Sequence, residues 1–173
     1  MDYIEFLESK QKRVVNSGFS IHESKLNRNL FPFQKFIVSR ALKAGKYALF
    51  EDCGLGKTIQ QLEWAHQVIL KTNKPVLILC PLAVSGQTIQ EGEKFGIKVN
   101  RYPEGDIQIS NYEQIDNIDC SVFSGIVLDE SSILKNYEGS IKKSVIDKFK
   151  YTPYKLCCTA TPSPNDPMEL GNH

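Results

Sequence analysis

The sequence predicts an α/β fold in which helices cover both faces of a mainly parallel sheet. From Ala48 onward, short β-rich runs alternate with amphipathic stretches of helical period. Strands that are separated by helical crossovers form parallel sheets. The continuous apolar run at 75–81 (PVLILCP) has the pattern of a strand buried on both faces. A chain of 173 residues is long enough to bury such a core without a metal or disulfides.

The individual elements follow from local patterns. A charged, amphipathic helix is predicted over 2–15, and another helix follows Pro32. The predicted strands are 47–51, 75–81, 98–102, 106–110, 126–129 and 155–159, and the remaining predicted helices are 57–71, 83–95 and 141–149. Gly86 and Gly92 weaken the helix over 83–95, because glycine is a poor helix former.

The composition is that of a soluble globular protein. Hydrophobic residues make up 41% and charged residues 24%, and no apolar run approaches the length of a membrane span. The net charge is only +1, so any nucleic-acid surface must be a local patch. The five cysteines are odd in number and form no C-x-x-C pair, which argues against a zinc site and a disulfide framework. We therefore expect reduced cysteines and a cytoplasmic protein of a bacterium or a phage-infected cell.

A glycine loop, EDCGLGKT at 51–58, lies between a predicted strand and a predicted helix. Such a loop can wrap backbone N–H groups around a polyphosphate, while its lysine neutralises charge and its threonine hydroxyl holds Mg²⁺. Glu51 stands where the usual pattern has its first glycine. The context still predicts a nucleotide site, whose binding residues are Cys53, Gly54, Leu55, Gly56, Lys57 and Thr58.

A pair of acids, Asp129 and Glu130, ends the apolar run at 126–128. Ligands of parallel sheets bind beyond the carboxyl ends of the strands, so we expect the acids to face the glycine loop. Asp129 would hold Mg²⁺ together with Thr58, and Glu130 would polarise the attacking water. With Lys57, these two acids are the predicted catalytic residues. The two motifs together predict binding of ATP, or a close relative, and its hydrolysis.

Further motifs stand around this pair. In chain order the motifs are FPFQ at 31–34, DCGLGKT at 52–58, LCPLAVSGQ at 79–87, ISNYE at 109–113, LDESSILKN at 128–136 and TATPSPND at 159–166. Their order resembles the glutamine motif and motifs I, Ia, Ib, II and III of the first RecA-like lobe of a superfamily 2 DEAD/DEAH-like helicase. In particular, the chain resembles the Swi/Snf-type DNA translocases and their phage-encoded relatives. The resemblance implies a P-loop NTPase with a three-layer α/β/α fold over 31–173 and a helical extension over 1–30.

The resemblance also implies roles for single residues. Gln34 would read the adenine edge, and Ser132, Thr159 and Thr161 would couple hydrolysis to movement. Residues that would face nucleic acid, duplex DNA in particular, are Pro81, Gln87, Ser110, Asn111 and Lys135. The alternative is that these five are ordinary surface residues. Ser131-Ser132 replaces the Ala-His of the family's motif II, and a serine reaches less far than a histidine.

The function implied is that of an ATP-dependent helicase or DNA translocase. In that family a second RecA-like lobe supplies arginine fingers, whereas this sequence stops at His173, shortly after motif III. We therefore expect a fragment whose second lobe lies in the same longer chain or in another chain, and which turns ATP over slowly. The alternative is a nucleotide-gated nucleic-acid-binding module with little or no hydrolysis. A small P-loop kinase is disfavoured, because no arginine lies between Lys142 and His173.

Overall fold

The structure, a computed structural model, describes residues 16–135 and 140–161. The predicted helix over 2–15 lies outside these residues. The α-helices are α2 (Pro32–Ala44), α3 (Lys57–Thr72), α4 (Ser85–Phe95) and α5 (Ser140–Lys148). The strands are β1 (Lys46–Phe50), β2 (Val76–Cys80), β3 (Asn100–Arg101), β4 (Ile107–Asn111), β5 (Gly125–Leu128) and β6 (Tyr154–Thr159). The short 3-10 helices are η1 (Glu23–Lys25), η2 (Leu82–Val84), η3 (Tyr112–Asn117), η4 (Cys120–Val122) and η5 (Ser131–Lys135).

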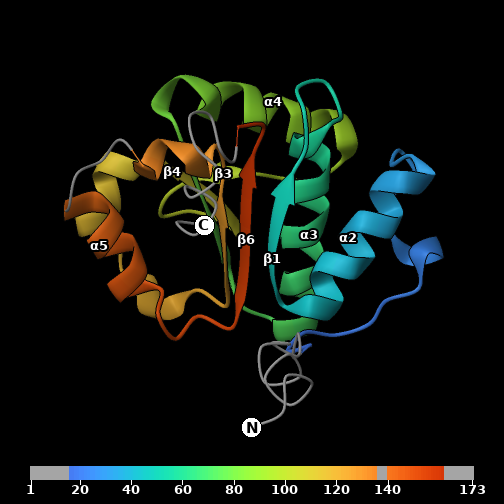
Figure 1. The fold of residues 1–173 in the computed structure, drawn as a ribbon, viewed down its shortest axis with the longest axis horizontal. Helices are drawn as coiled ribbons and strands as arrows, with labels where there is room; N and C mark the ends of the chain where they lie inside the picture. The colour runs from blue at the N-terminus through green and yellow to red at the C-terminus, as the bar shows by residue number, and fades with distance from the viewer. Residues whose placement is uncertain (1–15, 136–139, 162–173) are drawn as a thin grey trace, which may run out of the picture.

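The strands form one sheet in the order β1-β6-β5-β2-β4-β3, and every neighbouring pair is parallel. All carboxyl ends therefore lie at one edge of the sheet. Helices α2 and α3 cover one face and α5 covers the other (Figure 1). The predicted α/β fold with three layers is confirmed.

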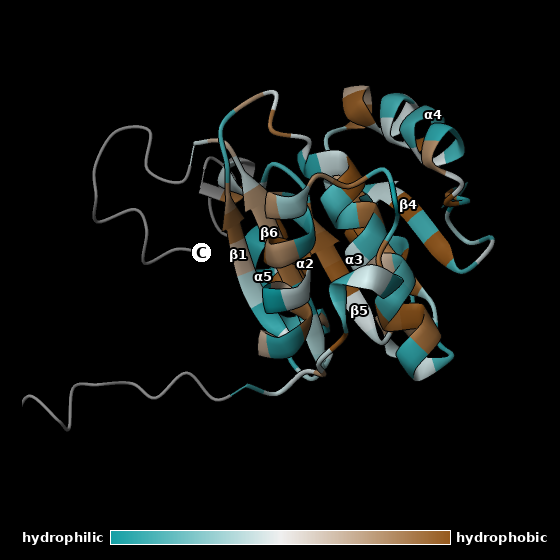
Figure 2. Cartoon of the chain, turned by 90° about the vertical axis from the view of Figure 1, so that its right-hand side faces the viewer, coloured by the Kyte–Doolittle hydropathy of each residue, from teal (hydrophilic) through white to brown (hydrophobic). Residues whose placement is uncertain are grey.

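Two hydrophobic cores, one on each face, hold the layers together. Along β2, Val76, Ile78 and Cys80 pack into the core beneath α2 and α3, whereas Leu77 and Leu79 pack into the core beneath η3 and α5. This alternation is what a strand buried on both faces requires, because successive side chains point to opposite faces. In Figure 2 the inner strands are largely brown, whereas the helices that cover them carry both teal and brown segments.

Two predicted elements differ from the structure. The strand predicted over 98–102 is the two-residue β3, which lies at the sheet edge and pairs only with β4. The helix predicted over 83–95 is divided into η2 and α4. An edge strand forms ladder hydrogen bonds with only one neighbour, so fewer of its residues pair than the local sequence pattern predicts.

Helix α3 is buried on nearly all sides, which its amphipathic pattern did not predict. It packs against α2, α4 and the sheet. Its polar side chains Gln60, Gln61, Glu63 and Gln67 are consequently buried as well. Glu63 finds partners in the backbone N–H of Asn27 (3.1 Å) and the amide of Gln67 (2.8 Å). Across 16–135 and 140–161, no helix combines the length and apolar character needed to cross a membrane.

The two glycines of α4 should respond oppositely to alanine. A Cβ on Gly92 would lie 2.5 Å from the Ile97 carbonyl oxygen, so Gly92→Ala should lower the free energy of unfolding by about 1–3 kcal/mol. A Cβ on Gly86 would meet no atom within 4 Å, so Gly86→Ala should raise it by about 0.5–1 kcal/mol. Urea denaturation measures both. Equal effects of the two substitutions would contradict this packing of α4.

Candidate nucleotide-binding site

The glycine loop follows β1 and leads directly into α3. Gly54 and Gly56 have φ angles of +81° and +76°, in the region that favours glycine. Gly56 is also the N-cap of α3, and a Cβ there would lie 2.5 Å from Gln34 Nε2. Gly56 is therefore required both by its backbone conformation and by the close approach of a side chain. The helix start supplies N–H groups and a partial positive charge to an anion at the loop.

Gln34 ties the start of α2 to this loop. Its Oε1 accepts a hydrogen bond from the Phe31 backbone N–H at 2.9 Å, and its Nε2 donates to the Leu55 carbonyl at 2.8 Å. The side chain is buried. The structure thus places Gln34 at the loop, with both ends of its amide bonded inside the chain.

A hollow of about 490 Å³ lies beside the loop. Its lining includes Phe31, Phe33, Gln34 and the loop segment 54–56. The rings of Phe31 and Phe33 stack at 6.3 Å with 7° between their planes, although 65% and 45% of these side chains are exposed. An aromatic wall next to a phosphate loop and a buried amide has the size and chemistry of a small-ligand pocket.

Lys57 bonds to the start of its own loop. Its Nζ donates to the carbonyl oxygens of Glu51 at 2.9 Å and Asp52 at 3.1 Å. The ammonium is therefore held over the loop, where an entering phosphate oxygen would be attracted to it. Burial raises the pKa of the Glu51 and Asp129 carboxyls, and the charge of Lys57 opposes part of that rise.

The two predicted acids stand at the end of β5, at the same sheet edge as the loop. Asp129 is only 7% exposed, and burial raises the pKa of its carboxyl above the ordinary range. A hydrogen bond from the Gln61 amide to Asp129 Oδ1 (2.6 Å) opposes that rise. Glu130 has a φ of +50°, an unfavourable backbone conformation for a non-glycine residue and one that clusters at functional sites.

Motif III connects the loop and the acids, because β6 lies between β1 and β5. The fully buried Thr159 accepts a hydrogen bond from the Glu51 N–H on one side (3.3 Å) and donates its hydroxyl to Glu130 Oε2 on the other (3.4 Å). The Thr161 hydroxyl donates to Ser132 Oγ at 3.3 Å. The structure therefore brings together the three residues predicted to couple the site, although that role remains a prediction.

Comparisons with known proteins agree with this arrangement. The chain is 29% identical to the SWI/SNF-related matrix-associated actin-dependent regulator of chromatin subfamily A-like protein 1 homolog of Caenorhabditis elegans, over 93% of this chain and 26% of that protein. It is also 29% identical to the Xenopus tropicalis protein of that name, over 86% of this chain and 17% of that protein. No family model matches. The chain thus spans about a quarter or less of the length of these relatives.

Solved structures show the same fold. The Sulfolobus solfataricus SWI2/SNF2 ATPase core domain superposes with a TM-score of 0.67 and 26% identity, over 91% of this chain and 38% of that one. The chain is related to the Swi/Snf-type helicases of superfamily 2. The UvsW helicase from bacteriophage T4, at 13% identity and a TM-score of 0.68, shares the fold over 99% of this chain and 65% of that one. The fold of this chain is that of a RecA-like lobe.

Several residues of this site were not predicted from the sequence. Buried Glu51 accepts a hydrogen bond from Gln60 Nε2 at 2.7 Å, and burial raises the pKa of Glu51. Gln61 and Tyr112 both bond to Asp129. The available signal was the pair Gln60-Gln61, two neutral polar residues in the first turns of the helix that follows the loop. The phenylalanines of the hollow lay within the glutamine motif itself.

The residues predicted to face nucleic acid lie partly together. Strands β2 and β4 pair Cys80 with Asn111, so Pro81 and the segment 110–111 meet at the carboxyl edge. Gln87 is exposed on α4, where its amide donates to Glu91 at 3.1 Å. The Lys135 side chain and residues 162–173 lie outside the described part of the chain. A nucleic-acid role for these residues remains a prediction.

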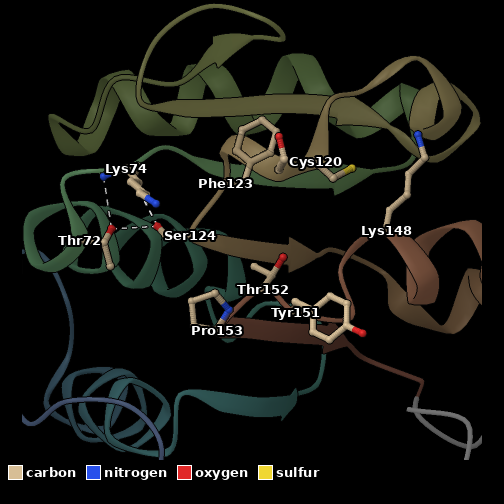
Figure 3. A pocket seen from close by; sticks show the side chains of 10 residues that line it. Thr72, Lys74, Cys120, Phe123, Ser124, Lys148, Tyr151, Thr152 and Pro153 are labelled. Atoms are coloured by element: carbon tan, nitrogen blue, oxygen red, sulfur yellow. Dashed lines mark hydrogen bonds between the residues drawn. The ribbon is translucent and has the colours of Figure 1, made fainter.

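A larger hollow, of about 710 Å³, lies at the opposite edge of the sheet (Figure 3). Its lining includes Lys74 and Ser124, just before β2 and β5, and Lys148 of α5. The Lys148 ammonium donates to the carbonyls of Ile115 (2.8 Å), Asp116 (3.0 Å) and Ile118 (3.3 Å). This lysine therefore stabilises η3, and the hollow is separate from the nucleotide site.

Cys53 should be the single fast-reacting thiol of the folded chain. It is exposed in the glycine loop, whereas Cys80 and Cys120 are buried, as is Cys158. Burial raises the pKa of Cys80 to about 12 and that of Cys157 to about 11, which leaves little reactive thiolate at pH 8. Titration with a maleimide should show one fast phase that is lost in Cys53→Ser and slowed by ADP. A fast phase that persists in Cys53→Ser would contradict this assignment.

Asp129→Asn should stabilise the fold while removing a site residue. Because burial raises the folded-state pKa, stability is lost as pH rises from the ordinary carboxyl pKa through the raised one. At pH 7.5 the variant should therefore melt higher, by about 2–4 °C for each kcal/mol relieved. Calorimetry should find that the gain shrinks near pH 4. Asp52→Asn, which changes an exposed carboxyl of the loop, is the control and should shift the melting temperature little. A gain that is independent of pH would contradict the role of ionisation.

Proposed function

We propose that the chain is the ATP-binding lobe of a Swi/Snf-type motor, which hydrolyses ATP with Mg²⁺ and couples hydrolysis to movement on nucleic acid. The observation that supports this most is the position of Thr159. It joins the residue that opens the phosphate loop to the acid predicted to activate water. A site built only to hold a nucleotide has no need of a third strand bonded to both halves.

ATP fits the chemistry of the loop and the adjacent hollow. The loop N–H groups, the start of α3 and Lys57 would bind the phosphates. The phenylalanine wall would take the adenine. Each end of the Gln34 amide makes one bond inside the chain, so its second N–H and second oxygen lone pair would supply polar contacts to the adenine edge. The hollow is lined by four of the residues predicted to bind the cofactor, Gln34, Gly54, Leu55 and Gly56, and we propose Phe31 and Phe33 as further contacts.

The donor set suits Mg²⁺, with Thr58 and Asp129 as the residues that would hold it. A hydroxyl and a carboxylate are hard oxygen ligands, and Mg²⁺ sites usually combine one or two carboxylates with phosphate oxygens and water. Within the described ranges, no three His, Cys, Asp or Glu side chains gather to hold a metal. A site shared with a nucleotide is therefore the kind that these residues can form. Bound Mg²⁺ would neutralise charge on the transferred phosphate.

Glu130 would act as the base that orients water. Its carboxylate accepts the Thr159 hydroxyl, so movement of β6 or of motif III would be transmitted to it directly. Ser132 supports the same coupling, because its hydroxyl reaches Thr161 despite being shorter than the histidine of the family. We therefore propose a coupled motor in preference to a nucleotide-gated binding module.

Duplex DNA is the proposed track. Pro81, Ser110 and Asn111 meet at the sheet edge that also carries the nucleotide site, and hydroxyl, amide and backbone N–H groups can contact phosphates without reading sequence. A Sulfolobus solfataricus SWI2/SNF2 ATPase core was solved in complex with dsDNA, and it shares this fold at 24% identity. The second lobe, with its arginine fingers, would come from another part of a longer protein or from another chain.

Nucleotide binding is tested by titrating the chain with fluorescent ADP. Lys57→Ala should weaken binding about tenfold to a hundredfold, which corresponds to the about 1.5–3 kcal/mol of hydrogen bonds to charged groups. Lys71→Ala is the matched control, because it removes a lysine from the far end of the same helix. Equal affinities for Lys57→Ala and the unchanged chain would contradict the proposed site.

Coupling is tested by steady-state ATP turnover with and without duplex DNA. The 173-residue chain should turn over slowly, because an arginine finger contributes about 10³–10⁵ in rate. A protein that carries both lobes should be fast and stimulated by DNA. Absence of turnover under every condition would favour the nucleotide-gated binding module over the motor.

A further inference from the structure

Asp129 is held at two atoms by residues from two different elements. From α3, Gln61 Nε2 donates to Asp129 Oδ1 at 2.6 Å. From η3, the Tyr112 hydroxyl donates to the Asp129 backbone carbonyl at 2.7 Å. Both side chains are almost completely buried, at 1% and 2% exposure. The backbone and the carboxylate of this residue are therefore each fixed from outside its own strand.

The Gln61 amide has a fixed sense. Only its nitrogen can donate to a carboxylate, so Nε2 must face Asp129. Its own oxygen, Oε1, is buried and finds no hydrogen-bond partner among the described residues. An unsatisfied buried acceptor costs about 1–3 kcal/mol, and an apolar residue of similar size would avoid that cost. Packing alone therefore does not explain a glutamine here.

The Gln61 bond fixes the rotation of the carboxylate. The Asp129 carboxylate accepts from the Gln61 amide at Oδ1 and also from the Glu130 backbone N–H, so the side chain cannot rotate without losing a buried hydrogen bond. A carboxylate oxygen has more than one lone pair, so a metal can still bind to a carboxylate that is oriented in this way. Mg²⁺ requires nearly ideal octahedral geometry. Substituting a residue that orients a metal ligand typically lowers the metal affinity about 10–100-fold.

We propose that Gln61 is a positioning residue for the metal of the nucleotide site, and that Tyr112 assists it by fixing the Asp129 backbone. The inference rests on the proposed function, since it concerns the Mg²⁺ that would accompany ATP. Tyr112 directly follows Asn111. The segment proposed to face nucleic acid is thus one residue away from a hydrogen bond to the proposed metal ligand.

The measurement is the ratio of fluorescent-ADP affinities in excess Mg²⁺ and in EDTA. In Gln61→Leu this ratio should fall about tenfold, while the affinity in EDTA stays within about twofold of the unchanged chain. A purely structural role would lower both affinities together or lower the melting temperature alone. Tyr112→Phe removes one hydroxyl and should shift the ratio in the same direction by about two- to threefold.

Gln67→Leu is the matched control for Gln61→Leu. Gln67 is also a buried glutamine of α3, but its amide donates to Glu63, which keeps a second donor in Asn27. The variant should leave the Mg²⁺ ratio unchanged.

The outcomes separate the inference from the proposed function. A normal ratio in folded Gln61→Leu would overturn the inference while leaving nucleotide binding intact. If Gln61→Leu does not fold, the Tyr112→Phe ratio decides, and an unchanged value overturns it. Failure of the unchanged chain to bind ADP would instead contradict the proposed function and the inference with it.

Discussion

The arrangement of this lobe depends on the parallel pairing of β6 between β1 and β5. Parallel pairing puts the carboxyl ends of all three strands at one edge. The phosphate loop, the acid pair and motif III each follow one of these strands, so they meet although they are far apart in the chain. The pairing also sets Phe50 opposite Thr159, so Thr159 lies next to Glu51, the first residue of the loop. Strand β6 thus provides one hydrogen-bonded path between the two halves of the site, and the bond from Gln61 of α3 to Asp129 provides another.

The burial of α3 is the second constraint, and it is costly. Within the described residues, five buried side-chain atoms have no hydrogen-bond partner, and three of them belong to Glu51, Gln60 and Gln61. The remaining two belong to Trp64 and Gln108. Such atoms oppose folding, since each lost a bond to water. Their concentration beside the loop and Asp129 shows that part of the hydrogen-bonding capacity of the site is unsatisfied within the described residues.

Burial is also electrostatically unfavourable for the two buried acids, Glu51 and Asp129. Burial raises the pKa of both Glu51 and Asp129, while Lys57 and the two glutamines counteract that rise. A carboxylate that is poorly solvated and only partly compensated is ready to gain from a cation. The lobe is therefore arranged so that a nucleotide and its metal would relieve an unfavourable feature of the free protein. Glu130, with its left-handed backbone, adds local strain at the same place.

The sequence by itself determined most of the helices and strands and two parts of the site, the glycine loop and the acid pair. Apolar, β-rich runs and helical patterns predicted the five longer strands and helices α3 to α5 within one or two residues, together with a helix after Pro32. The glycine loop and the acids were evident from the elements predicted on either side of them. These are local properties, set by neighbours in the chain. Only the tertiary structure decided the brevity of β3, the burial of Gln60 and Gln61, and the bonds of Gln61 and Tyr112 to Asp129. These features depend on which elements become neighbours in space. The pattern of residues along the chain does not specify which element will pack or pair with which.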